Sequence, residues 1–583
     1  MKLSRLVDYQ DYIEAAMRSW HCPGTAVAVM RGDEVIHQST HGLRDVDAGL
    51  PVTADTRFPL ASVTKSFTAM SVALLVDEGK LEWDKPVREY IPEFVLDDPY
   101  VTQHITVRDM LSHRSGLPRH DMAAWRLDLS PAEFIKRMRH LKFSASLREK
   151  FQYNNLMFHA AAYLVERLAG QRWEDFVHER IFGPLGMVSS NFRPEPPQAG
   201  QPEAKGYRIE RDEKGAPTGV VETPIGFHTE LSPGSAGALF STLADLIRWL
   251  RVHVNDGRSG ETQLVSSANL QQMHLPHMII PGGGIFEALF GNTIFTYALG
   301  WFVEPYAGHT LIHHGGNVEG HSLIVGFVPQ EQVGVVVLTN AATIPLRDAL
   351  LFESIDRALD LPDRDWNHKL HEVVDPLLAG RERGKQTSAA ERVEGAPASR
   401  GFDAYVGEYE AKGYPDFAVR LADGELQARL VDNLPWSPLN HYHYDVFEWD
   451  LADWELRLKV RFATNVNGEL DAVSVPVEPA VEDVMFTRKQ PHVDEATIAA
   501  LAGRYEPPVP GLTFTVTTAN GKAYFASDGE APREIKAYRV ADGVVGFRLE
   551  RVRLDFDLED GAVVRLNFKD EGLSLEAPRV AER

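Results

Sequence analysis

A stretch without a periodic pattern divides this chain into two parts that have to fold differently. Residues 381–400 are rich in Gly, Ala, Ser, Gln and charged side chains, a composition typical of a linker. Before them, apolar residues recur at both helical and strand spacing. After them, short alternating runs between Gly-containing turns predict strands with almost no helix. Because 583 residues exceed what one hydrophobic core supports, we expect separate domains on the two sides.

The strand-rich part looks like an internal duplication. Two blocks of similar length open with similar sequences, YVGEYE and LAGRYE, and each continues through short strands joined by a Gly turn. Such a duplication predicts two small antiparallel barrels or sandwiches. The expected boundaries are 1–380 for the first domain, 381–401 for the linker, and 402–490 and 491–583 for the two blocks.

In the first domain the pattern predicts an α+β fold, an antiparallel sheet with helices packed on it. An amphipathic helix near the N-terminus precedes a hairpin of two strands, Gly24–Met30 and Glu34–Ser39. Two apolar runs, Thr310–His313 and Ser322–Val328, are also expected to be strands, and Leu346–Leu359 is expected to be the closing helix.

The pair Ser62-x-x-Lys65 stands at the start of a predicted apolar helix, Val63–Asp77. Residues three apart on a helix face the same way, so we expect the Lys65 amine beneath the Ser62 hydroxyl. A serine nucleophile needs such a base within hydrogen-bond reach, and a helix N-terminus offers free N–H groups to an oxyanion. Ser and Lys are common residues, however, and the pair arises by chance about once or twice in a chain of this length.

Two later motifs, Tyr153-x-Asn155 and His314-x-Gly316, add to this pair. Taken singly, the first is more often a polar turn and the second an ordinary strand histidine. In this order, the three motifs resemble the serine β-lactamase and penicillin-binding protein superfamily, in particular its class C β-lactamase-like branch of D-aminopeptidases, DD-peptidases and carboxylesterases. Four further stretches resemble the same branch: residues 78–92, 111–117, 182–187 and 236–242.

The resemblance covers about the first 360 residues and implies a catalytic domain of that fold, with an all-helical subdomain beside the sheet. A catalytic domain followed by two small β-barrels is similar to some D-aminopeptidases. The resemblance also implies that Ser62 attacks a carbonyl and is acylated, and that a neutral Lys65 accepts or relays its proton. Tyr153 would pass the proton to the leaving group and later activate water, and Asn155 would contact the substrate backbone.

The resemblance also implies that the third motif, His314-x-Gly316, completes the site. The backbone N–H groups of Ser62 and Asn317 would form the oxyanion hole, and Gly316 would let the strand approach the substrate closely. His314 would orient Tyr153 or a substrate carboxylate. Dedicated β-lactamases usually have Lys at the position of His314, and histidine is mostly neutral near pH 7, so we expect weak β-lactam hydrolysis.

Composition excludes several other classes. The formal net charge of −23 argues against nucleic acid and anionic membranes as partners. The N-terminus lacks the apolar run of a secretory signal, and no stretch is apolar enough to span a membrane, so we expect a cytoplasmic protein. Cys22 is the single cysteine and is expected to be buried without a disulfide. His309 and His313 have a metal-like spacing but no H-E-x-x-H motif, so we expect no metal and no other cofactor.

The expected function is hydrolysis of a small peptide, amide or ester through an acyl-Ser62 intermediate, with a D-aminopeptidase-like peptidase in first place. The alternatives within this class are a carboxylesterase and a weak β-lactamase or DD-peptidase. A different class, a non-catalytic penicillin-recognising or scaffold protein, is a further alternative. Assembly into a homo-oligomer is left open by the sequence.

Overall fold

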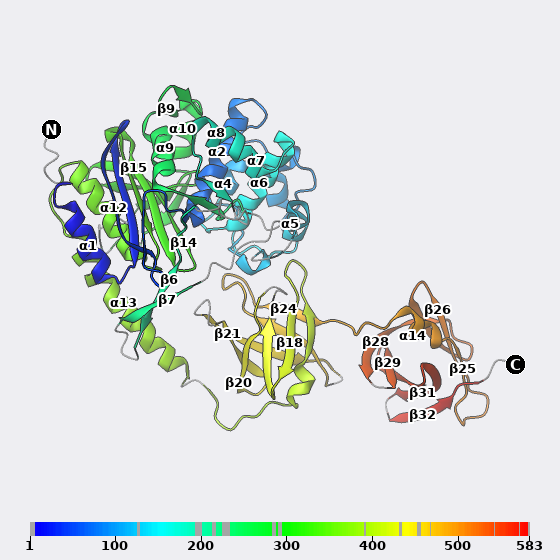
Figure 1. Cartoon of the computed structure of the whole chain (residues 1–583). Coiled ribbons are helices and arrows are strands. Elements are labelled where there is room, and N and C mark those ends of the chain that lie inside the picture. Colours follow the sequence, from blue (N-terminus) through cyan, green and yellow to red (C-terminus); the bar gives the residue numbers. More distant parts are fainter. Residues whose placement is uncertain are drawn as a thin grey trace.

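The computed structural model describes residues 6–580 except 125–126, 128, 193–200, 213–216, 224–233, 283–286, 288, 290–293, 390–391, 431–433, 452–455, 467, 542 and 571. It contains an α+β domain followed by two eight-stranded antiparallel β structures, as the sequence predicts (Figure 1). The first of these is a closed barrel and the second is nearly closed; they are called the first and the second barrel below.

A nine-stranded antiparallel sheet forms the centre of the α+β domain, in the order β11-β12-β13-β14-β15-β16-β1-β2-β3. All residues of β15 and β16 are buried, because helices cover both faces of the sheet. The strands of this sheet are β1 (Gly24–Arg31), β2 (Glu34–Asp45), β3 (Leu50–Pro51), β11 (Met278–Pro281), β12 (Ile294–Tyr297), β13 (Phe302–Tyr306), β14 (His309–Val318), β15 (His321–Val328) and β16 (Val333–Thr339).

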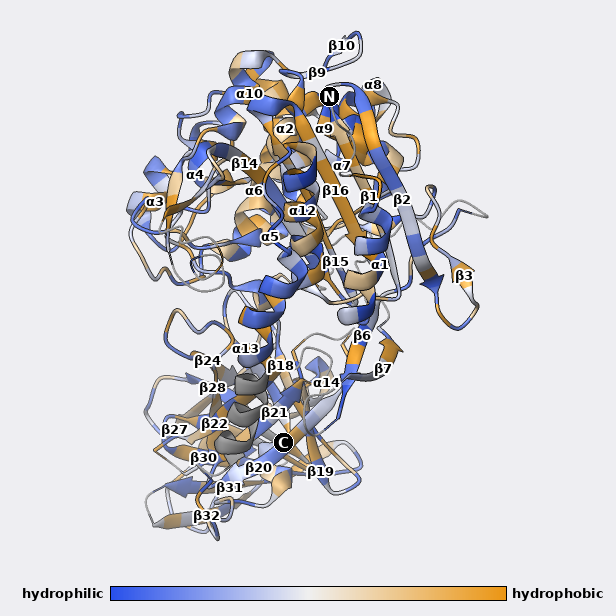
Figure 2. Ribbon diagram, turned by 90° about the vertical axis from the view of Figure 1, so that its left-hand side faces the viewer, coloured by the Kyte–Doolittle hydropathy of each residue, from blue (hydrophilic) through white to orange (hydrophobic). Residues whose placement is uncertain are grey.

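Successive side chains of β1 point to opposite faces of the sheet, and each face has its own hydrophobic core. Val27 and Val29 pack on one side, whereas Ala26 and Met30 pack on the other; the central strands are coloured as hydrophobic in Figure 2. The first side is covered by α1 (Tyr9–Ser19), α12 (Ile344–Ala358) and α13 (Trp366–Ala389). The second side carries α2 (Thr64–Asp77), α4 (Val107–Leu111), α5 (Pro131–Met138), α6 (Asn155–Ala169), α7 (Trp173–Val177), α8 (Gly183–Leu185), α9 (Leu243–Val254) and α10 (Ser267–His274).

Smaller elements complete the α+β domain. A three-stranded sheet, in the order β4-β8-β5, lies where α2 begins. These and the remaining short elements are α3 (Pro99–His104), β4 (Phe58–Pro59), β5 (Asn191–Phe192), β6 (Tyr207–Arg211), β7 (Pro217–Glu222), β8 (Leu239–Ser241), β9 (Arg258–Ser259) and β10 (Thr262–Gln263). Within the described ranges, the helices are all too short or too polar to cross a membrane.

Each barrel follows the chain in simple order, β17 to β24 and β25 to β32. The first consists of β17 (Gly407–Glu410), β18 (Phe417–Ala422), β19 (Glu425–Arg429), β20 (Ser437–His443), β21 (Val446–Leu451), β22 (Leu456–Thr464), β23 (Leu470–Val475) and β24 (Val484–Arg488). The second consists of β25 (Gly503–Tyr505), β26 (Phe514–Ala519), β27 (Lys522–Ser527), β28 (Arg533–Ala541), β29 (Val544–Leu549), β30 (Val552–Glu559), β31 (Ala562–Asp570) and β32 (Leu573–Pro578).

Three segments differ from the sequence-based expectation. β14 does not end at His313 but continues to Val318, because residues 314–318 pair with β15. α13 continues to Ala389, into the stretch expected to be a linker. A short helix, α14 (Glu495–Ala500), precedes the second barrel, where strands were expected; Asp494 caps it by accepting the Thr497 N–H. The domain boundaries given above remain a proposal.

Candidate active site

Ser62 lies at the junction between a short strand and the buried helix α2. The Leu60 N–H donates to the Leu239 carbonyl at 2.7 Å and ties the chain to β8. Ala61 then takes a left-handed conformation with φ of 43°, which is strained for a residue that has a Cβ atom. This turn leads through the 3₁₀ segment Ala61–Val63 into α2 and leaves Ser62 partly exposed at the start of the helix.

Lys65 faces Ser62 from the first turn of α2. Its Nζ atom lies 3.1 Å from Ser62 Oγ, 2.9 Å from the Ala236 carbonyl oxygen and 4.9 Å from the centre of the Tyr153 ring. The side chain is fully buried. Burial, and after it the positive charge of Arg119, lowers the pKa of Lys65 well below its ordinary value. Both effects favour the neutral form of the amine next to the serine hydroxyl.

Tyr153 reaches the same hydroxyl from the start of α6. The preceding loop is fixed because the Asn154 side chain caps α6, accepting the Met157 N–H at 2.9 Å. Burial raises the pKa of Tyr153 above its ordinary value, and the interaction of its hydroxyl with Ser62 lowers that pKa by less. Tyr153 is thus a neutral phenol that shares Ser62 with Lys65.

Asn155 makes a contact that the sequence did not indicate. Its Nδ2 donates to Asp121 Oδ1 at 2.9 Å, and Asp121 Oδ2 accepts from Arg119 Nε at 2.7 Å. The Arg119 guanidinium also lies over the Tyr153 ring, 5.2 Å from its centre. An ion pair of Arg119 and Asp121 therefore borders the groups around Ser62.

Strand β14 runs closely past the Ser62 turn. A Cβ atom at Gly316 would lie 2.2 Å from the Leu60 carbonyl oxygen, so only glycine allows this approach. β14 pairs with β13 over His309–His313, and the part beyond it lies against the turn that holds Ser62. The motif around Gly316 is therefore brought to Ser62 by the sheet.

Asn317 follows Gly316 on this strand. Its side chain does not extend into the site, because its Oδ1 accepts from Ser322 Oγ at 2.8 Å and from Arg347 Nη1 at 3.1 Å. Buried Arg347 also donates to the Gly316 carbonyl at 2.9 Å. The strand backbone that would supply an oxyanion N–H is thus held from behind by α12.

His314 is buried and has two hydrogen-bond partners. Its Nδ1 lies 2.8 Å from the Gly315 carbonyl, which only accepts, so Nδ1 carries the proton and Nε2 accepts from the Tyr297 hydroxyl at 2.9 Å. Burial lowers the pKa of His314 well below its ordinary value. Its partner is therefore Tyr297 rather than Tyr153, whose ring centre is 6.3 Å away.

His113 and Tyr297 were not found by sequence reasoning. The His113 Nδ1 accepts the Asn154 N–H at 3.0 Å, and its ring centre lies 4.3 Å from that of Tyr153 and 4.6 Å from that of Tyr297. Burial lowers the pKa of His113 well below its ordinary value. His113 falls in residues 111–117, a stretch already noted for its resemblance, whereas no local pattern marks Tyr297.

Other predicted residues lie apart from this site. His313 Nε2 lies 3.1 Å from the buried Glu304 carboxylate, and His309 Nδ1 lies 3.7 Å from Glu331, so the two histidines have separate acidic partners. Cys22 is buried as expected, and burial raises the pKa of its thiol to about 12.

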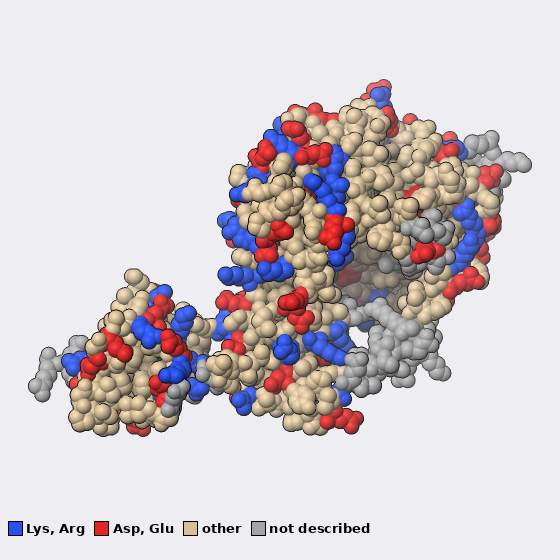
Figure 3. Space-filling model, turned by 180° about the vertical axis from the view of Figure 1, so that it is seen from behind, with Lys and Arg blue, Asp and Glu red and all other residues tan. Residues whose placement is uncertain are grey.

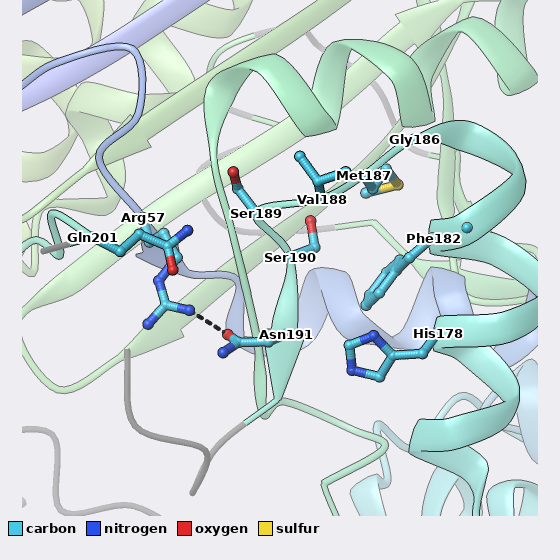
Figure 4. A pocket seen from close by; sticks show the side chains of 11 residues that line it. Arg57, His178, Phe182, Gly186, Met187, Val188, Ser189, Ser190, Asn191 and Gln201 are labelled. Carbon is cyan, nitrogen blue, oxygen red and sulfur yellow. Dashed lines mark hydrogen bonds between the residues drawn. The ribbon is translucent and has the colours of Figure 1, made fainter. Parts of the chain in front are cut away.

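A cavity of about 350 Å³ opens beside β5, lined by residues other than those around Ser62 (Figure 4). Its buried Arg57 donates to Asn191 Oδ1 at 2.6 Å and to Glu203 Oε2 at 2.8 Å, so its charge is already compensated. On the face shown in Figure 3, basic and acidic side chains are intermixed over the α+β domain and the barrels, which gives no field of a single sign there.

Comparison with known proteins gives a family match over most of the α+β domain. The family model described as Beta-lactamase matches residues 9–359, and a model described as a domain of unknown function matches residues 391–488. The unguisins hydrolase ungD' of Aspergillus campestris is 29% identical over 505 residues, which cover 82% of this chain and 90% of that protein. Penicillin-binding protein 4 of Amycolatopsis lactamdurans is 29% identical over 336 residues, 57% of this chain and 84% of that protein.

Among solved structures, the octameric penicillin-binding protein homologue from Pyrococcus abyssi superimposes with a TM-score of 0.54. The match covers 84% of this chain and all of that chain at 22% sequence identity. At this identity the match shows a shared fold, and the matched length is greater than that of the α+β domain alone.

Proposed function

Because this chain belongs to the beta-lactamase family, we propose that it is a serine hydrolase that cleaves an amide or peptide bond through an acyl-Ser62 intermediate. The observation that carries the proposal is the 3.1 Å distance between Lys65 Nζ and Ser62 Oγ, combined with full burial of Lys65. A neutral amine at this distance is a base for the hydroxyl proton.

The proposed reaction has two halves. In acylation, Ser62 Oγ bonds to the substrate carbonyl carbon while its proton passes to Lys65. Tyr153 relays a proton to the leaving nitrogen or oxygen, and the bond from that atom to the carbonyl carbon breaks. In deacylation, water bonds to the acyl carbon, the bond to Ser62 Oγ breaks and the serine regains a proton.

The N–H groups of Ser62 and Asn317 are the proposed donors to the oxyanion in both halves. One such donor contributes about 3 kcal/mol to the stabilisation of a tetrahedral intermediate. Ser62 lies at a helix start, where N–H groups lack intrahelical acceptors, and β14 brings Asn317 alongside it.

A D-aminopeptidase-like peptidase is the specific activity we propose. Support comes from the α+β domain followed by two barrels, and from a relative named as a hydrolase that matches 82% of this chain. A carboxylesterase is the alternative, since the same acyl-enzyme chemistry serves esters. The neutral His314 offers no ammonium group to a β-lactam carboxylate, so β-lactam hydrolysis is expected to be weak.

Intact-mass measurement after treatment with a fluorophosphonate or a penicillin tests the nucleophile. We expect one adduct on the native protein and none on Ser62→Ala. A panel of D- and L-aminoacyl p-nitroanilides, p-nitrophenyl esters and nitrocefin then identifies the substrate class, with nitrocefin the slowest. Fast nitrocefin turnover would contradict the role given to His314, and a native protein with neither adduct nor turnover would favour the non-catalytic alternative.

A further inference from the structure

The first barrel contacts the α+β domain at a segment that borders the Ser62 site. The segment runs from Leu117 to Ala123, with His120 in its middle. The His120 N–H donates to Glu478 Oε2 at 2.7 Å, and His120 Nδ1 lies 2.5 Å from the Tyr414 hydroxyl. Tyr414 and Glu478 belong to loops of the first barrel, and all three residues are more than nine-tenths buried. These three are called the His120 cluster below.

The protons of the His120 cluster follow from its geometry. His120 Nε2 lies 2.8 Å from the Lys142 carbonyl, which only accepts, so Nε2 carries the ring proton. His120 Nδ1 is then the acceptor, and the Tyr414 hydroxyl donates to it. Burial lowers the pKa of His120, which keeps the ring neutral. His120 has a left-handed φ of 46°, and such a strained conformation persists only where its surroundings hold it.

Close packing surrounds the cluster. Gly413 of the barrel loop before β18 has a φ of +91°. A Cβ atom there would lie 3.0 Å from Leu141 Cδ2 and 3.2 Å from His140 Cβ, so the loop fits tightly against the chain that follows α5. Figure 1 shows this end of the barrel next to α5. The first barrel is therefore docked on the α+β domain at a defined place.

The neighbours of His120 face the active site. Arg119 lies over the Tyr153 ring at 5.2 Å, and Asp121 accepts from Asn155 at 2.9 Å. His120 is thus bound to the first barrel, whereas its two neighbours in sequence, Arg119 and Asp121, contact residues of the Ser62 site.

We propose that the first barrel is a positioning domain for the Ser62 site, and that the His120 cluster holds Arg119 and Asp121 in place against that site. Its test by enzyme kinetics rests on the proposed function, whereas its test by amide hydrogen exchange does not. It also gives a role to the region that matches a domain of unknown function.

A displaced segment would change the charges that face the base. The groups facing Lys65 are Arg119, Asp121, His113, His314 and Tyr153. The positive charge of Arg119 lowers the pKa of Lys65, and the negative charge of Asp121 raises it. If Arg119 moves away, Lys65 holds its proton to higher pH, and activity falls first on the acidic side of the pH profile.

Tyr414→Phe in the full chain is the test variant, because it removes one hydroxyl from the cluster and keeps the ring. The matched control is Tyr409→Phe, which removes a buried hydroxyl that bonds to the Tyr405 carbonyl within the same barrel. We expect kcat/KM of Tyr414→Phe to fall about five- to tenfold, which is the effect of one lost buried hydrogen bond. The acidic limb of its pH–activity profile should lie at higher pH than in the native protein. The control should stay within about twofold.

Amide hydrogen exchange gives a readout that needs no substrate. Residues 117–123 should exchange faster in Tyr414→Phe than in the native protein and in Tyr409→Phe. Glu478→Gln retains an oxygen acceptor for the His120 N–H and should leave exchange near the native rate. Unchanged exchange and an unchanged pH profile in Tyr414→Phe would overturn the inference, whereas failure of the native protein to turn over any substrate would overturn only the proposed function.

Discussion

The two barrels have the same strand order but a different relation to the rest of the molecule. Tyr414 and Phe417 of the first barrel belong to the hydrophobic core that also contains α2 and α6. The second barrel has a core of its own. It meets the first through Glu469, which forms ion pairs with Arg548 and Arg553 (3.4 Å to the latter). Shared architecture therefore does not imply shared function, since the contacts of each barrel decide whether it can act on the site.

The first barrel can influence catalysis only if Ser62 is part of an active site. Ser62→Ala should lower turnover by roughly 10⁴-fold or more, because it removes the proposed nucleophile. Ser66→Ala is the matched control: Ser66 lies one turn along α2, and its hydroxyl donates to the Val63 carbonyl at 2.8 Å. Turnover on the substrate panel is the measurement, and equal loss in both variants would point to unfolding rather than to chemistry.

Replacing corresponding aromatic residues of the two barrels should have the next largest effect, in this case on stability. Phe417 and Phe514 are buried on β18 and β26, the second strand of each barrel. Replacing either by Ala should cost about 3–5 kcal/mol in free energy of unfolding. Calorimetry should show that Phe417→Ala lowers the unfolding transition of the α+β domain and reduces activity, whereas Phe514→Ala affects a separate transition and spares activity. Identical calorimetric traces for the two variants would contradict the view that only the first barrel unfolds together with the α+β domain.

Removing one positive charge near Lys65, and one on the second barrel as a control, tests whether only the region contacted by the first barrel affects the site. Arg119→Gln removes a positive charge that lowers the pKa of Lys65, so this pKa should rise, the neutral fraction should shrink and activity should fall as pH decreases. We expect a loss of about threefold on the acidic limb, since Arg119 is 53% exposed and its charge is screened.

The matched control for this change is Arg553→Gln, at a partly exposed arginine of the second barrel. It should leave the pH dependence of kcat/KM as in the native protein. A shift of the acidic limb in the opposite direction for Arg119→Gln would contradict the place given to Arg119.

The smallest effect is expected at the contact between the barrels. Glu469→Gln removes the charge that pairs with Arg548 and Arg553, and ion pairs of this kind contribute about 0–1 kcal/mol. Activity should stay within about twofold of native, and small-angle scattering should report a modest increase in the radius of gyration. A large loss of activity would show that the second barrel also acts on the site.

Much of the fold follows from local sequence patterns. The predicted strand Ser322–Val328 differs from β15 by one residue at its start, and the duplicated blocks form the two barrels. The spacing of Ser62 and Lys65 placed the amine beneath the hydroxyl because helix geometry alone relates residues three apart. A repeat, a period and a short spacing are all properties of neighbouring residues, so the sequence contains them directly.

The remaining features arise only when distant segments meet. Gly316 is needed because the Leu60 carbonyl passes beside it, Tyr297 supplies the proton that His314 accepts, and Tyr414 bonds to His120 across 294 positions of the chain. Gly316 stands in a motif that the sequence shows, but Tyr297 and Tyr414 stand in no recognisable pattern, since each is selected by its place in space and not by its neighbours in sequence. Long-range packing therefore decided how the site is supported, while local spacing had already placed the Lys65 amine beside the Ser62 hydroxyl.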